Sequence, residues 1–345
     1  NAGTYAVTGA TSVSGGTVNF NAAASTGALS VSGGVLGGSG TLAVSGALTW
    51  TGGNMSGTAG TTTVNGGTIS GTAPEGLHAG YTLTNTGTLV WTGAGTFFIY
   101  DSGVFSNAGT FDAQNDAVIS YFSGPVGTIN NSGTFKKTVG TGTTTVGTNV
   151  VFNNTGTVAA QSGTLSLNGG GTHSGDFTAA TGATLGFGGG THDLNAGTDV
   201  TGAGTVQVSG GTLNVNAGTY AVTGATSVTG GTANFNSTAS TGALSVSGGV
   251  LGGSGTLAVS GALTWTGGRM SGTAGTTTVN GGTISGTAQK DLHAGYTLTN
   301  TGTLVWTGTG TFFIYDSGVF SNPGTFDVQN DAVISHFNGP VVTIN

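Results

Sequence analysis

The stretch Asn107-Ala108-Gly109-Thr110-Phe111 returns 24 residues later as Asn131-Ser132-Gly133-Thr134-Phe135. Between residues 65 and 219 the motif Asn-x-Gly-Thr begins at seven asparagines, spaced by 20, 22, 24, 23, 41 and 21 residues: Asn65, Asn85, Asn107, Asn131, Asn154, Asn195 and Asn216. The interval of 41 holds two steps, so the repeat length is about 20–24 residues. A short fixed period of this size is typical of solenoid proteins.

An apolar residue stands four positions after most of these asparagines. The members of this set are Ile69, Leu89, Phe111, Phe135, Val158 and Tyr220. Nearby runs such as Tyr81–Thr84 alternate apolar residues with Thr or Ser, and glycine pairs or Asn-Gly turns end them. A period of two predicts strands, and Thr, Gly and Val are poor helix formers.

A coil of this length cannot bury its apolar face alone and must stack on its neighbours. The sequence therefore predicts an all-β fold, a parallel β-helix (β-solenoid) of about 16 coils, with right-handed coiling expected. The six apolar residues would form a core column. The seven asparagines would form a structural amide ladder, each side chain bonding to the one above, and glycines would serve the corners.

A longer repeat lies above the short one. Residues 1–130 return as residues 216–345 at a constant offset of 215, with 14 differences in 130 positions. We interpret residues 1–215 as a first repeat unit and residues 216–345 as a partial second copy, joined in one continuous solenoid. Because the chain stops partway through the second copy, we expect it to be a segment of a longer array.

The composition excludes several classes of function. Lys and Arg number only 4 against 11 Asp and Glu, and charged residues make up 4% of the chain, compared with about one quarter in ordinary domains. Four basic residues cannot form the positive track that nucleic acid requires. Cys is absent, so no disulfide or thiolate metal site can form. The apolar stretches are too short for a membrane span, and no motif indicates a cofactor.

One polar cluster merits a test for chemistry. It comprises Asp112, Gln114, Asn115 and Asp116, repeated as Asp327, Gln329, Asn330 and Asp331. Asp112 and Lys136 each stand five residues after a motif asparagine, so the pair should meet on adjacent coils. We interpret the cluster as a polar turn with one surface ion pair, worth about 0–1 kcal/mol. A calcium site and a catalytic site are the alternatives.

The histidines have structural interpretations. His78 and its counterpart His293 lie in the stretch where the copies differ most, which predicts an exposed loop. Glu75 could orient His78, but Lys290 replaces Glu75 in the second copy. His173 and His192 are 19 residues apart, each in Gly-Thr-His, and are expected to stack as a structural ladder. Two histidines could also begin a metal site, but no third ligand is evident.

The aromatic residues form one conspicuous block. Phe97–Tyr100 returns as Phe312–Tyr315, and the four tryptophans are Trp50, Trp91, Trp265 and Trp306. At alternating positions in a β-helix such residues are expected in the core. A contiguous Phe/Tyr patch that stayed exposed would instead indicate a partner interface or a surface on which sugars stack.

The run Leu42–Gly53, with its alternating Ala-Val-Ser-Gly and Leu-Thr-Trp-Thr segments, resembles the giant β-strand-repeat proteins of bacterial surfaces. More loosely, the chain is similar to autotransporter passengers and filamentous-haemagglutinin-type adhesins. The resemblance implies a β-solenoid and an extracellular or cell-surface location. Those families use the same architecture as stalk, adhesin or enzyme scaffold, so the resemblance selects no ligand.

Three functions remain as hypotheses. The first is a non-catalytic structural segment of an extracellular fibre, stalk or filament, whose partners are other copies or further repeats of itself. Its scarcity of charge and flat Thr/Ser/Gly faces lack the usual defences against strand association. The second is an adhesin that binds surface polysaccharide or another cell through repeated solenoid faces. The third is a polysaccharide lyase or hydrolase that uses Asp112, and it is the one we favour least.

Overall fold

The computed structural model describes residues 4–337, 339 and 343–344. The fold is an all-β parallel β-solenoid of about 16 turns, with no helix in the described ranges. This confirms the predicted fold class; the right-handed coiling stays a prediction. It follows that no described helix is long and apolar enough to cross a bilayer.

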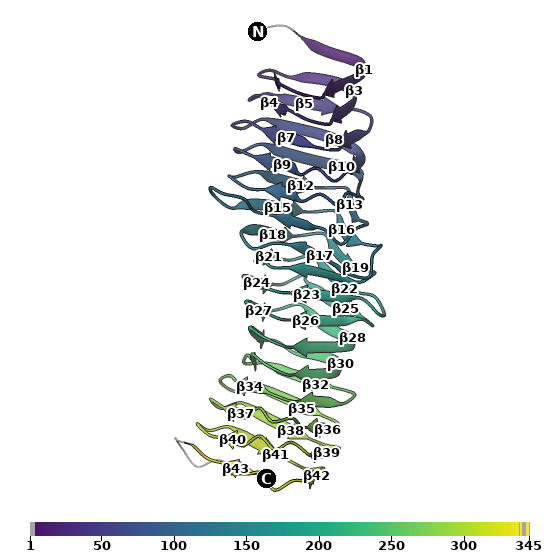
Figure 1. Ribbon diagram of the computed structural model, residues 1–345. Helices are drawn as coiled ribbons and strands as arrows, with labels where there is room; N and C mark the ends of the chain where they lie inside the picture. The colour runs from purple at the N-terminus through teal and green to yellow at the C-terminus, as the bar shows by residue number, and fades with distance from the viewer. Residues whose placement is uncertain (1–3, 338, 340–342, 345) are drawn as a thin grey trace. The chain divides into compact units, whose positions relative to one another are not determined.

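The chain divides into two compact units, Asn1–Asp176 and Phe177–Asn345. This boundary differs from that of the sequence duplication, which falls after residue 215. In both units, short parallel strands stack coil on coil (Figure 1).

The strands of the first unit are β1 (Tyr5–Val13), β2 (Thr17–Asn19), β3 (Ala24–Val31), β4 (Val35–Gly37), β5 (Thr41–Val44), β6 (Leu48–Trp50), β7 (Gly53–Ser56), β8 (Thr61–Ile69), β9 (Glu75–His78), β10 (Thr82–Trp91), β11 (Phe97–Ile99), β12 (Val104–Asn107), β13 (Thr110–Ala113), β14 (Val118–Ser120), β15 (Gly127–Asn131), β16 (Thr134–Lys137), β17 (Thr143–Val146), β18 (Val150–Asn154), β19 (Thr157–Ala160), β20 (Thr164–Leu167) and β21 (Gly171–His173).

The remaining strands, from the unit boundary onward, are β22 (Asp176–Ala179), β23 (Thr184–Phe187), β24 (Thr191–Leu194), β25 (Asp199–Gly202), β26 (Thr205–Val208), β27 (Thr212–Val215), β28 (Thr219–Val228), β29 (Thr232–Phe235), β30 (Ala239–Val246), β31 (Val250–Gly252), β32 (Thr256–Val259), β33 (Leu263–Trp265), β34 (Gly268–Ser271), β35 (Thr276–Val279), β36 (Gly282–Ile284), β37 (Lys290–His293), β38 (Thr297–Asn300), β39 (Thr303–Trp306), β40 (Phe312–Ile314), β41 (Val319–Ser321), β42 (Thr325–Val328), β43 (Ile334–Ser335) and β44 (Thr343–Ile344).

Each turn of the solenoid contributes three strands, one to each of three parallel sheets. In the first unit, β12 pairs with β15, β13 with β16 and β14 with β17. In the second unit, β35 pairs with β38, β36 with β39 and β37 with β40. Longer strands such as β1 and β10 bend through two sheets, with a register shift at the bend.

The core follows the alternation seen in the sequence. Leu89, Phe111, Phe135 and Val158 stand directly above one another on β10, β13, β16 and β19, and all four are fully buried. The rings of Phe111 and Phe135 stack with centroids 4.8 Å apart. Burying a side chain of this size contributes about 1.5–3 kcal/mol, so like residues stacked on like residues form a continuous apolar interior.

The other two predicted column members take different places. Ile69 is buried, but it pairs with Trp91, while Gly67 stands opposite Leu89. Motif counting places Asn65 opposite Asn85, but Val64 lies there, and the register shifts by one further residue before Thr88. Tyr220 is buried in the second unit, where it pairs with Val200.

Candidate functional site

The asparagine ladder is built from four coils of the first unit. Asn85, Asn107, Asn131 and Asn154 are in register on β10, β12, β15 and β18, and all are buried. Each side-chain amide donates to the side-chain oxygen on the next coil, over 2.8, 2.7 and 2.7 Å. His173 follows Asn154 in the same register. The second unit repeats one step, because Asn300 donates to Asn322 over 2.7 Å.

Three predicted members lie outside this ladder. Asn65 is exposed, because the register of β8 against β10 places Val64 opposite Asn85. Asn195 and Asn216 belong to the second unit and form a separate row with Asn236, at 3.3 and 3.0 Å, on the exposed surface. The shared motif therefore marks two different kinds of amide row, one internal and one external.

Two lysine side chains contact the predicted polar cluster, each in a different way. Asp112 and Lys136 are in register on adjacent coils, with Nζ 3.7 Å from Oδ2. Gln114 and Thr138 also donate to the Asp112 carboxylate, over 3.0 and 2.7 Å. This carboxylate is therefore fully engaged by the protein. Within the described part of the chain, no three His, Cys, Asp or Glu residues gather as a metal site would require.

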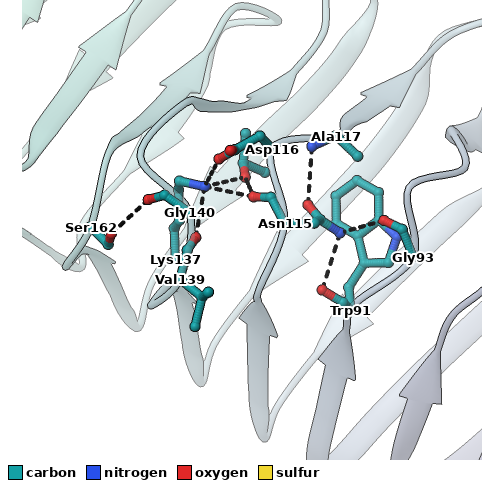
Figure 2. Close-up of polar contacts among 10 residues, drawn as sticks. Trp91, Gly93, Asn115, Asp116, Ala117, Lys137, Val139, Gly140 and Ser162 are labelled. Atoms are coloured by element: carbon teal, nitrogen blue, oxygen red, sulfur yellow. Dashed lines mark hydrogen bonds and ion pairs between the residues drawn. The ribbon is translucent and has the colours of Figure 1, made fainter.

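The second cation, Lys137, points inward and is fully buried, a feature the sequence reasoning missed. Figure 2 shows its ammonium group surrounded by oxygen atoms. Nζ donates to Asn115 O at 2.5 Å, Asp116 Oδ1 at 2.6 Å and Val139 O at 3.0 Å. Thr144 Oγ1 accepts a further hydrogen bond at 3.0 Å. The hydrogen bond from Lys137 holds the pKa of Asp116 below its ordinary value.

Asn115 links this buried ammonium to the neighbouring coil (Figure 2). Its side-chain amide donates to Trp91 O at 3.1 Å and Gly93 O at 2.9 Å, and its Oδ1 accepts from the Ala117 amide at 3.1 Å. Every group around Lys137 is thus used within the protein. The ammonium group therefore links the loop at Asn115 and Asp116 to Val139 and Thr144 and holds these segments together.

An exposed aromatic cluster lies on the sheet formed by β7, β9 and β11. We call it the first aromatic ledge, comprising His78, Phe98, Tyr100 and Phe122. The His78 and Tyr100 rings stack at 4.7 Å, and Phe122 contacts Phe98 and Tyr100 with centroids 6.0 and 5.7 Å apart. Phe122 is 70% exposed. Burial lowers the pKa of His78 below its ordinary value, so the stacked imidazole is neutral at pH 7.

The second copy repeats this cluster as the second aromatic ledge, comprising His293, Phe313, Tyr315 and Phe337. His293 and Tyr315 stack at 4.7 Å, and Phe337, 77% exposed, lies 6.4 and 6.3 Å from Phe313 and Tyr315. Alternation explains the split of the predicted block, because Phe97, Ile99 and all four tryptophans point inward and are buried. The sequence reasoning did not include Phe122, which alternation alone cannot place because it follows the end of β14.

A groove borders the first ledge. Its volume is about 540 Å³, and its lining combines the glycine backbone at Gly33, Gly34 and Gly53 with Asn54 and the rings of Phe98, Tyr100 and Phe122. The equivalent glycines of the second copy line a groove of about 460 Å³ together with Arg269, Gln289 and Asp291, and none of the described rings of the second ledge is among its lining residues.

Glu75 is the most unusual titratable group near the first ledge. It is fully buried, and neither carboxyl oxygen finds a hydrogen-bond partner among the described residues. Burial raises its pKa to about 7. It does not orient His78, whose Nδ1 instead lies 3.3 Å from Ser56 Oγ. Lys290 takes the equivalent place in the second copy, where it is also buried and donates to Gly286 O.

The two histidines of the Gly-Thr-His motifs are both buried. His173 lies in the first unit with its ring 6.4 Å from Phe152, and His192 lies in the second with its ring 5.0 Å from Phe187. Their predicted stacking on each other stays a prediction. Comparisons of the chain with protein-family models, curated proteins and solved structures gave no significant match.

Proposed function

We propose that this chain is a structural repeat segment of an extracellular bacterial fibre, stalk or surface filament, non-catalytic and associating with further copies of itself. The observation that carries the proposal is the axial amide ladder. Asn107 uses Asn85 on one side and Asn131 on the other as hydrogen-bond partners. Polar groups that must be satisfied by the coils above and below favour a chain of many like coils.

The outer faces support association. The sheet of β12, β15 and β18 presents Val104, Thr128 and Val151 in one outward row and Ser106, Asn130 and Asn153 in the next. Such a face carries no charge. Natural sheets that avoid sticking together place Lys or other charged side chains at such positions.

Sedimentation velocity and electron microscopy of the whole chain at low salt test this proposal. We expect oligomers or filaments that grow with protein concentration. The double variant Thr128→Lys/Asn153→Lys places two charges on the outer face and should shift the distribution toward monomer. A parent protein that stays monomeric at millimolar concentration would overturn self-association.

A second candidate function is that of an adhesin, and the two aromatic ledges favour it. Exposed rings beside a groove are characteristic of surfaces that bind a partner. The ledges occupy equivalent positions in both copies, so an array of such units would present them repeatedly. The sedimentation experiment with Phe122→Ala and Phe337→Ala separates the candidates, because loss of the ledges should leave association through the charge-free faces unchanged.

A further inference from the structure

The sequence differences between the two copies are concentrated around the aromatic ledges. Of the 14 positions that distinguish the copies, four line the first groove: Asn54, Pro74, Glu75 and Gly76. Two more, Tyr121 and Ser123, flank the exposed ring of Phe122. The rings themselves are unchanged between the copies. Constant stacking rings within a variable polar rim indicate a ligand platform with altered selectivity.

The chemistry of the groove fits a saccharide better than a protein. The floor is glycine backbone, and the raised edge is made of aromatic rings. The C–H groups on the face of a sugar ring carry partial positive charge and pack against the negative face of an aromatic ring. The backbone at Gly33, Gly34 and Gly53 lets a flat ligand approach closely and offers peptide groups to its hydroxyls. A volume of about 540 Å³ is in the range of small-molecule sites.

The Glu75 carboxyl is not part of the groove surface. Glu75 is in register with Phe97, whose ring points into the core, and its side chain is fully buried. The outer surface of β9 at this place is formed by Gly76, which is in register with Asn54 and Phe98.

The rim of the second ledge has a different charge pattern. Arg269, exposed, replaces Asn54, and Asp291 replaces Gly76 in the register position beside it. Gln289 donates to Asp291 Oδ1 over 2.5 Å, which fixes the carboxylate. A guanidinium group binds a carboxylate in a bidentate manner, so this rim suits an acidic sugar.

We propose that the aromatic ledges are saccharide-binding subsites, the first for neutral sugars and the second for sugars that carry a carboxylate. This inference deepens the adhesin candidate and rests on it. Self-association of the chain is independent of it. Phe122 and Phe337 would be the stacking platforms, and the residue at position 54 or 269 would set the selectivity.

An array of neutral and carboxylate-bearing oligosaccharides, followed by titration of the bound members, tests the proposal on the whole chain. We expect Phe122→Ala to weaken neutral binding at least tenfold, with acidic binding unchanged. Phe337→Ala should do the reverse. Both rings are exposed, so neither variant should disturb folding, which the far-ultraviolet circular dichroism spectrum checks.

Exchange of the rim residue provides the selectivity test. Arg269→Asn should abolish the preference of the second ledge for acidic sugars, and Asn54→Arg should raise acidic binding at the first. Absence of binding across the array at millimolar saccharide would overturn the proposal, as would binding that survives loss of both rings. Loss of self-association in the ring variants, without saccharide binding by the parent, would instead identify the ledges as contacts between copies.

Discussion

The side-chain amide of Asn107 donates to the side-chain oxygen of Asn131 over 2.7 Å, although the two residues are 24 positions apart in the chain. The same nitrogen also contacts Gly109 O at 3.3 Å and Thr134 O at 2.9 Å. One asparagine thus closes the turn of its own coil and clamps the next coil. The glycine two residues later is required for a different reason, because a Cβ at Gly109 would lie 2.1 Å from the carbonyl oxygen of Gly87 on the preceding coil.

Substitution of Asn107 by Ala should be strongly destabilising. It removes the donor to the buried Asn131 Oδ1 and to Thr134 O, whereas the Asn85 amide loses one acceptor and keeps Gly87 O and Thr110 O. Each acceptor that loses its donor costs about 1–3 kcal/mol, and we expect a total loss of about 2–4 kcal/mol. Urea unfolding of the whole chain measures the loss, and hydrogen exchange should show opening centred on β12 and β15.

The exposed motif member Asn65 provides the matched control. Its side chain is outside the ladder, so Asn65→Ala should change stability by about 0.5 kcal/mol or less. Equal effects of the two substitutions would contradict the assignment of Asn107 to a stabilising ladder.

The adjacent lysines Lys136 and Lys137 should respond very differently to replacement by Met. Lys137 is buried, so its replacement by Met leaves Val139 O without its donor and Asp116 without its cation, whereas Asn115 O keeps the Thr144 hydroxyl as a donor. Each buried oxygen left without a donor costs about 1–3 kcal/mol, while the side chain of Asp116 is 44% exposed and can be solvated by water. Lys136 makes a single surface contact, and its replacement should cost about 1 kcal/mol or less. Thermal melts of both variants, recorded side by side, measure the contrast.

A small and equal decrease in melting temperature for both lysine variants would show that the buried ammonium group of Lys137 is not needed for stability. The pair is a strict comparison because the residues are neighbours on one strand, differ only in the side of the sheet they face, and receive the same substitution.

The fold could be predicted from the sequence because each coil repeats the same information. Phe111 and Phe135 alternate with Thr and polar residues, and that period fixes which side chains enter the core. The register of Asp112 with Lys136 could be counted from the motif in the same way, and the two are in register in the structure. Counting succeeds wherever a coil has no insertion or bend between the motif and the residue in question.

Asn65 and Lys137 show where counting is insufficient. The register of β8 against β10 runs unbroken from Thr61 to Val64 and places Val64, not Asn65, opposite Asn85, which a motif search cannot detect. Alternation after Phe135 does place Lys137 inside, but a buried lysine is disfavoured unless partners are present. Those partners come from the loop at Asn115 and Asp116 and from Val139 and Thr144 after Lys137 itself, in segments whose path the sequence does not specify. Phe122 was missed for the same reason, because it belongs to a loop.

The glycine two residues after each ladder asparagine should tolerate no side chain. A Cβ at Gly133 would lie 2.0 Å from the carbonyl oxygen of Gly109 on the preceding coil, and one at Gly156 would lie 2.1 Å from that of Gly133. Because the clash is with backbone, the coils themselves would have to separate. We expect Gly133→Ala to cost about 3 kcal/mol or more, measured as a shift in the urea midpoint.

Gly15 is the control for this prediction, because no atom lies within 4 Å of a Cβ built there and its φ is outside the left-handed region. Gly15→Ala should be neutral or should stabilise by about 0.4–1 kcal/mol, through the lower entropy of the unfolded chain. A Gly133→Ala variant as stable as Gly15→Ala would refute close contact between the coils at this corner.

Glu75 should make the stability of the chain depend on pH in an unusual direction. Burial raises its pKa from 4.5 to about 7, so the folded state binds more protons than the unfolded state between these values. Stability therefore falls as pH rises from 4.5 to 7 and is constant above, with a loss of about 3 kcal/mol. Glu75→Met should remove this slope and should be more stable than the parent at pH 8, whereas the parent should approach it at pH 4.5.

Lys290, at the position equivalent to Glu75, should make the stability of the chain rise with pH instead of fall. Burial lowers the pKa of Lys290, so its charged form is disfavoured in the folded state at neutral pH and the penalty shrinks as pH rises toward its ordinary value of 10.5. Lys290→Met should therefore stabilise at pH 7 and progressively less above. Melting temperatures of the parent and both variants from pH 4.5 to 10 test the two slopes together. Parallel profiles for all three proteins would show that neither buried charge controls stability. Glu75 and Lys290 should produce slopes of opposite sign in stability against pH, so a single compensating group could not mask both slopes.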